Sequence, residues 1–139
     1  DIMATIKELL RTEATGGLSF GNYELDKKTK LSDFKHQGDS YKVKTFHEIT
    51  KLEKEGTFVY ESVPGTSVYD MKIQDGDVEF AVEGFDNTQI TIGLDADSEY
   101  RVILDKETVG FIKTNLSGKL SFSADLNRNK AVNVKLIKM

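Results

Sequence analysis

The residues that could carry chemistry are few, and their types exclude several reactions. The chain has 139 residues with no Cys and two histidines, His36 and His47. A thiolate metal site, a Cys nucleophile and a three-His metal site therefore cannot form from its own side chains. A Ser-His-Asp triad would need one of the two histidines beside a Ser. We predict no triad and expect both histidines to lie at the surface or its rim.

Acidic loops offer a second kind of chemistry, the binding of a hard cation. Asp75 and Asp77 flank Gly76, and Asp95 and Asp97 lie in another short polar segment. Calcium prefers such oxygen ligands, although Asp is also a typical turn residue. None of these segments matches the twelve-residue EF-hand loop. The four aspartates are calcium candidates only, and we predict no bound metal and no cofactor.

Exposed aromatic rings would indicate a binding surface for a sugar or a protein. The chain has no Trp, and its aromatic residues are eight Phe and five Tyr. Most of these rings are needed in a core of this size. Tyr23, Tyr60 and Tyr69 are the candidates for exposed ligand contacts.

The charge balance of the chain limits the kinds of partner that it is expected to bind. The chain has 19 Lys and Arg against 23 Asp and Glu, a net charge of −4, and its arginines are Arg11, Arg101 and Arg128. Phosphate backbones attract basic surfaces, so we do not expect nucleic acid as a partner. No window has the eighteen apolar residues of a membrane span, and no secretory signal is evident. On this sequence we expect a cytoplasmic protein.

The N-terminal segment is predicted to contain the only helix. Met3 in third place indicates that residues 1–2 are a cloning remnant. Ile6, Leu9 and Leu10 continue an apolar stripe with Met3, which predicts a short helix within residues 3–16. Such a helix must dock on the protein or on a second copy. Ile6, Leu9 and Leu10 are thus candidate oligomer contacts.

From Leu18 onward the period changes to two, and turn residues recur every eight to twelve positions. This spacing predicts an antiparallel β-sandwich over residues 17–139, with 17–75 and 76–139 as two β subdomains left open. Residues 31–38 are predicted to be irregular. Residues 46–52 are predicted to form a hairpin, with a helical turn as the alternative. Val63-Pro64-Gly65-Thr66 predicts a type II turn. Asp75-Gly76 between alternating runs predicts a two-residue hairpin turn.

One segment carries a specific structural motif. Leu94 and Tyr100 lie six residues apart across a polar turn that leads into an alternating strand. The pair resembles the tyrosine corner of fibronectin type III and other immunoglobulin-like sandwiches. The resemblance implies that Tyr100 is buried and that its hydroxyl bonds the backbone a few residues upstream.

Longer stretches carry two further resemblances. Residues 90–138 resemble the immunoglobulin-like accessory domains of polysaccharide-processing enzymes, through Tyr-Arg-Val at 100–102, Thr-Asn at 114–115 and the final Val-x-Val strand. The whole chain is similar to a group of small proteins of anaerobic bacteria that often carry the label endosialidase. Segments 18–23, 41–46 and 58–66 carry this likeness. The first resemblance implies an accessory role, and the second implies a glycosidase.

The residues themselves favour a protein that is not an enzyme. A sialidase site clamps a sugar carboxylate with clustered arginines and uses acidic residues for proton transfer. This chain has three scattered Arg and no Trp. The strand-borne carboxylates, which we expect to be solvated, are Glu61, Glu79, Glu83 and Glu99. We therefore predict a non-catalytic sandwich that binds itself or another protein, with a carbohydrate-binding accessory module as the alternative and a glycosidase as the second alternative.

Overall fold

The chain forms thirteen β-strands within residues 6–127 and 130–139, which the computed structural model describes. The described residues contain no helix, and so none that could cross a membrane. The strands are β1 (Leu10–Thr12), β2 (Leu18–Phe20), β3 (Thr29–His36), β4 (Asp39–Phe46), β5 (Ile49–Lys54), β6 (Thr57–Val63), β7 (Ser67–Gln74), β8 (Asp77–Glu83), β9 (Thr88–Gly93), β10 (Glu99–Leu104), β11 (Glu107–Lys113), β12 (Lys119–Ala124) and β13 (Val132–Lys138).

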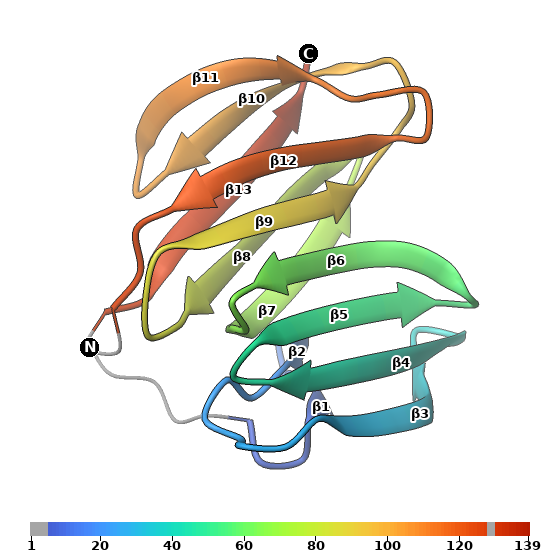
Figure 1. Cartoon of the computed structure of the whole chain (residues 1–139). Helices are drawn as coiled ribbons and strands as arrows, with labels where there is room; N and C mark the ends of the chain where they lie inside the picture. Colours follow the sequence, from blue (N-terminus) through green and yellow to red (C-terminus); the bar gives the residue numbers. More distant parts are fainter. Residues whose placement is uncertain (1–5, 128–129) are drawn as a thin grey trace.

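The strands build two antiparallel sheets that face each other (Figure 1). Sheet A has the order β1-β2-β7-β8-β13-β10-β11, and sheet B has the order β12-β9-β6-β5-β4-β3. The core lies between them. Tyr60 of sheet B packs edge to face between Phe20 and Phe80 of sheet A, with ring centroids 5.2 Å and 5.9 Å away. The predicted mainly-β sandwich is confirmed.

The predicted N-terminal helix is wrong in the described residues. Leu10 begins strand β1 and lies opposite Phe20 of β2. Leu9 has a φ of 71°, and its N–H donates to the carbonyl of Ile6 at 3.1 Å, which closes a turn. The apolar spacing of this segment thus reflects a turn and a strand. A helix of about ten residues is marginal by itself, so pairing with β2 decides the conformation. Met3 lies outside the described residues.

Strand β3 occupies most of the segment predicted to be irregular. It pairs with β4, but the register shifts between Leu31 and Phe34, and Asp33 has a φ of 61°. This bulge interrupts the alternation from which a strand is predicted. The hairpin predicted over residues 46–52 is confirmed, because Phe46 of β4 lies opposite Ile49 of β5.

The two predicted turns have opposite outcomes. Asp75 and Gly76 have φ values of 54° and 86° and join β7 to β8, as a tight hairpin turn requires. The type II turn at Pro64 and Gly65 is wrong, because Gly65 has no positive φ. Gly65 instead lies so close to Phe46 that a Cβ would clash with the carbonyl oxygen of that residue.

The hydrophobic core extends across the alternative boundary that would divide the chain into two β subdomains. The alternative boundary between residues 75 and 76 falls inside the β7–β8 hairpin, where Gln74 pairs with Asp77. One cluster of buried apolar side chains includes residues from both sides of that boundary, among them Leu52, Val68 and Leu136.

A network of buried hydroxyl groups holds the passage from β6 to β7. Thr66 Oγ1 lies 2.7 Å from both the Tyr60 hydroxyl and the Ser62 hydroxyl. The Thr50 hydroxyl donates to the Thr66 carbonyl at 2.8 Å and accepts from the Thr66 N–H at 3.0 Å. Thr45 lies 2.8 Å from Thr50 in the same network. All five residues are fully buried, and no buried polar side-chain atom of the described residues lacks a partner.

Replacing Thr66 by Val is expected to lower the free energy of unfolding by about 2 kcal/mol, because the Tyr60 and Ser62 hydroxyls lose a buried partner. Urea unfolding followed by circular dichroism measures this loss. The double variant Tyr60→Phe with Thr66→Val should lose less than the sum of the two single changes, since it removes both partners of one bond. Strict additivity would show that the hydroxyls act independently.

Candidate functional site

The three tyrosines predicted as ligand contacts are buried. Tyr23, Tyr60 and Tyr69 expose only 2%, 0% and 7% of their surface, and of the three only Tyr69 lines the groove described below. Tyr60 fills the inter-sheet core. Tyr69 lies opposite Ala81 of β8, outside the main core cluster. The prediction that these rings are exposed is wrong.

Two of these tyrosines, Tyr23 and Tyr69, are held in the interior by hydrogen bonds to a buried carboxylate. Glu83 is fully buried and accepts hydrogen bonds from the hydroxyls of Tyr23 at 3.0 Å and Tyr69 at 3.4 Å. Burial raises the pKa of both tyrosines, and the Glu83 carboxylate raises each further. The expectation that Glu83 is solvated is therefore wrong, and its carboxylate serves as an internal acceptor.

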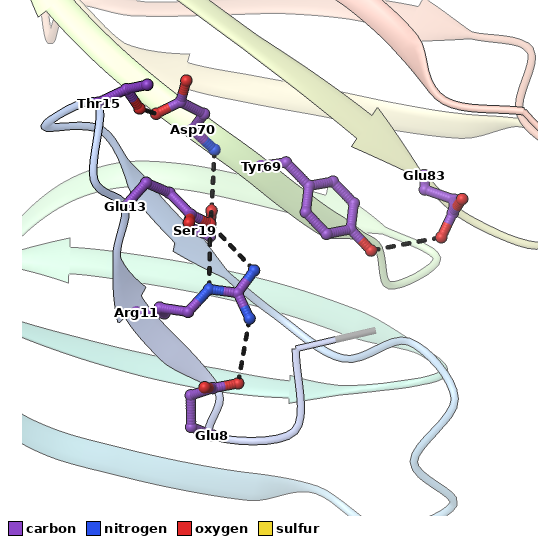
Figure 2. Close-up of polar contacts among 8 residues, drawn as sticks. All are labelled: Glu8, Arg11, Glu13, Thr15, Ser19, Tyr69, Asp70 and Glu83. Carbon is purple, nitrogen blue, oxygen red and sulfur yellow. Dashed lines mark hydrogen bonds and ion pairs between the residues drawn. The ribbon is translucent and has the colours of Figure 1, made fainter. Parts of the chain in front are cut away.

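A cluster of polar contacts fastens the β1–β2 hairpin to β7 (Figure 2). The Ser19 hydroxyl donates to the Glu13 carboxylate and accepts from the backbone N–H of Asp70 at 2.9 Å. Arg11 donates to Glu13 at 3.0 Å, and Thr15 donates to Asp70 at 2.6 Å. The hydrogen bond from Ser19, aided by Arg11, lowers the pKa of Glu13. The cluster keeps Glu13 ionised and joins distant parts of the chain.

Ser19 also belongs to a motif that the sequence analysis overlooked. Gly17-Leu18-Ser19-Phe20-Gly21 matches the G-x-S-x-G pattern of a nucleophile elbow. An elbow places its Ser on an exposed turn between a strand and a helix. Here Ser19 lies within strand β2, is fully buried and is bonded to Glu13 and Asp70. The motif therefore has a structural role in this chain.

The candidate oligomer contacts are occupied within the chain itself. Ile6 and Leu10 are fully buried, and Leu9 packs partly buried against the core. Leu10 contributes to the ladder between β1 and β2. These side chains are not available to a second copy in this conformation.

The four calcium candidates lie in two turns that Lys138 connects. Asp77 accepts the backbone N–H of Lys138 at 2.9 Å, and Asp95 pairs with the Lys138 ammonium at 2.8 Å. Asp97 pairs with Lys113 at 3.1 Å. Asp75 occupies the hairpin turn. In the described part of the chain, no three acidic or His side chains gather as metal ligands.

The tyrosine corner has the geometry that its resemblance implies. Tyr100 is almost fully buried, and its hydroxyl accepts the backbone N–H of Asp95 at 3.2 Å. Leu94 packs against the core from the preceding loop. The bond spans the passage from β9 in sheet B to β10 in sheet A.

A cleft between the sheets contains one of the two histidines. It measures about 360 Å³ and is lined by His36, Tyr41 and Lys54 among others. His36 is only 6% exposed, so the expectation of a surface position is wrong for it, whereas His47 is exposed. Its Nδ1 lies 2.9 Å from the Thr12 hydroxyl. Within the described residues no carboxylate is hydrogen-bonded to the imidazole.

A groove crosses the outer face of sheet A. It measures about 410 Å³, and its lining includes Asp70, Glu79, Ala81, Ile103, Asn133 and Lys135. Ala81 of β8 and Asn133 of β13 lie opposite each other beneath it. Small and apolar groups with several hydrogen-bonding side chains around them are typical of ligand sites. We call this feature the sheet A groove.

The most exposed strand is the edge of sheet A. We call residues 107–113 the β11 edge, because β11 pairs only with β10. Val109 and Phe111 are each 56% exposed. Among the described strands, β11 alone has two exposed large apolar side chains. Val109 has no direct partner in β10, because the register shifts beside it. An edge of this kind is a template for another chain.

No family model matches the sequence, and neither a curated protein nor a solved structure shows significant similarity to it. The candidate sites therefore depend on the geometry of this chain.

Acid should destabilise the protein through His36. Burial lowers the pKa of His36 below its ordinary value of 6.5, whereas the unfolded chain keeps that value. The unfolded state then takes up the proton first, so stability is full above pH 6.5 and falls as the pH drops towards the folded pKa. Replacing His36 by Gln should remove this fall, which is at most about 1.4 kcal/mol per pH unit.

Chemical denaturation at several values between pH 7.5 and about pH 5 measures the effect. This range excludes the contribution of Glu13, whose lowered pKa changes the stability only below the ordinary value of 4.5. His47→Gln is the matched control, since His47 is exposed. Equal pH profiles for the protein and its His36→Gln variant would contradict the prediction.

Proposed function

We propose that the protein is a non-catalytic β-sandwich that acts by protein contact, pairing with a second copy of itself through the β11 edge. The exposure of Val109 and Phe111 on an unpaired strand supports this proposal. Two groups of catalytic type, the Ser19 hydroxyl and the Glu83 carboxylate, are fully buried and hydrogen-bonded within the protein. The likeness of residues 90–138 to immunoglobulin-like accessory domains stays a proposal, supported by the Tyr100 corner.

The sequence of the β11 edge is complementary to itself. If two copies pair antiparallel about a twofold axis at Gly110, Glu107 of each lies opposite Lys113 of the other. Val109 then lies opposite Phe111 of the other copy. Opposite charges and apolar pairs directly across two strands are favourable. A twofold contact makes each of these pairs twice, which favours a second copy as the partner.

Replacing Phe111 by Lys is expected to abolish self-association, because it places a cation in an apolar pair and blocks the edge. Sedimentation velocity over a range of concentrations measures the dimer fraction. The matched control is Ile73→Lys, since Ile73 is exposed to a similar degree, 59%, on another strand. The control should associate like the unaltered protein. A protein that stays monomeric at several hundred micromolar would contradict the proposal.

A charge exchange tests the register. Glu107→Lys should weaken the dimer by placing two lysines opposite each other, and adding Lys113→Glu should restore it. Lys113 also pairs with Asp97 of its own chain, where both side chains are more than 60% exposed. The loss of that pair should cost little stability. Failure of the double variant to recover would exclude this register.

The sheet A groove supports a carbohydrate-binding module as a second candidate. Its carboxylate, amide and ammonium groups could bind sugar hydroxyls, while Ala81 and Ile103 offer apolar contact. Of the three tyrosines predicted as ligand contacts, Tyr69 also lines this groove, whereas Tyr23 and Tyr60 do not.

A glycan array should then give hits that Ala81→Tyr weakens at least about tenfold by filling the groove. Ser121→Tyr on the outer face of sheet B serves as the control and should bind like the unaltered protein. An array without hits, or hits that Ala81→Tyr leaves intact, would exclude this candidate.

A further inference from the structure

A small hollow lined almost entirely by lysines lies on the outer face of sheet B. It measures about 130 Å³, and its lining, which we call the lysine hollow, consists of Lys30, Lys42, Lys44, Lys51 and Glu53. These residues belong to the neighbouring strands β3, β4 and β5 (Figure 1). A hollow of this volume has room for a compact anion.

The strand register places three of these cations in one row. Lys30 of β3 lies opposite Lys44 of β4, and Lys44 lies opposite Lys51 of β5. Neighbouring strands lie only about 4.8 Å apart. Like charges directly across a pair of strands are destabilising. The row is therefore unfavourable for folding unless something neutralises it.

The protein's own carboxylates neutralise the row only in part. Glu53 lies opposite Lys42 and 3.9 Å from the Lys51 ammonium, and Glu61 lies opposite Lys51 on β6. Within the described ranges, Lys30, Lys42 and Lys44 have no ion pair, although the whole chain has 23 carboxylates and a net charge of −4. An excess of positive charge thus persists locally in an acidic protein.

The composition of the hollow selects the kind of anion. It contains no Arg to grip a planar carboxylate with two parallel bonds, and no aromatic ring on which a nucleobase could stack. Lysine ammonium groups act as mobile point charges and are common phosphate ligands. Several of them around a small hollow favour a compact group with more than one negative charge.

We propose that the lysine hollow binds a phosphate-type oxyanion with at least two negative charges, such as free pyrophosphate. The anion would lie over the row and replace the repulsion between Lys30, Lys44 and Lys51 by attraction. The site lies on the sheet opposite to the β11 edge, so it does not depend on self-association.

Inorganic pyrophosphate serves as the test ligand, with potassium chloride at matched ionic strength as the reference. Pyrophosphate should raise the melting temperature, and titration calorimetry should show saturable binding. Lys44→Gln should weaken binding at least about tenfold, because it removes the central cation. The same variant should melt at a higher temperature than the unaltered protein when no anion is present.

Two further variants separate binding from folding. Lys44→Arg keeps the charge and should keep most of the affinity. Lys7→Gln removes an exposed lysine that lies outside the lysine hollow, and this variant should bind pyrophosphate normally. The proposal is overturned if pyrophosphate acts no more strongly than chloride, or if Lys44→Gln binds as tightly as the unaltered protein.

Discussion

The hydroxyl network around Thr66 is the interaction on which the sandwich depends. At this point the chain leaves sheet B after β6 and enters sheet A at β7, and backbone groups in such a passage lose the partners that a ladder supplies. Thr50 bonds both the N–H and the carbonyl of Thr66, and Ser67 donates to the carbonyl of Gly21 at 2.9 Å. Hydrogen bonds thus hold the passage between the two sheets in place, and apolar side chains fill the space between the sheets.

A sandwich built in this way closes its faces but not its edges. Sheet A ends in the three-residue β1 on one side and in the seven-residue β11 on the other. The short edge offers little to a partner. Ser19 accepts the backbone N–H of Asp70 and so holds the hairpin against β7, while Arg11 bonds Glu13 within the hairpin. The long edge is interrupted by one bulge and exposes two apolar side chains. The asymmetry between the two edges is the physical reason why association is assigned to β11.

The sequence allowed prediction of those features that depend on neighbouring residues. Asp75-Gly76 predicted its turn, and Leu94 with Tyr100 predicted the corner between the sheets. Features that depend on distant residues could not be read in this way. In the sequence, Tyr69 resembles an exposed strand residue. The fold brings it together with Glu83, 14 positions away, and Tyr23, 46 positions away, and all three side chains are buried. Ile6 and Leu10 fit a helix only while their partner strand, β2, is ignored.

The lysine hollow shows the same limit for charge. Along the chain, each lysine of Lys30, Lys44 and Lys51 is an ordinary polar residue on a strand, and only the register makes them neighbours. Elsewhere the turns and strands pair their charges locally, as with Lys138 and Asp95 or Lys113 and Asp97. A net charge of −4 therefore coexists with a locally positive region, because only Glu53 and Glu61 lie opposite these lysines. Since repulsion within a sheet lowers stability, an anion that neutralised this row would stabilise the folded protein by binding to it and not to the unfolded chain.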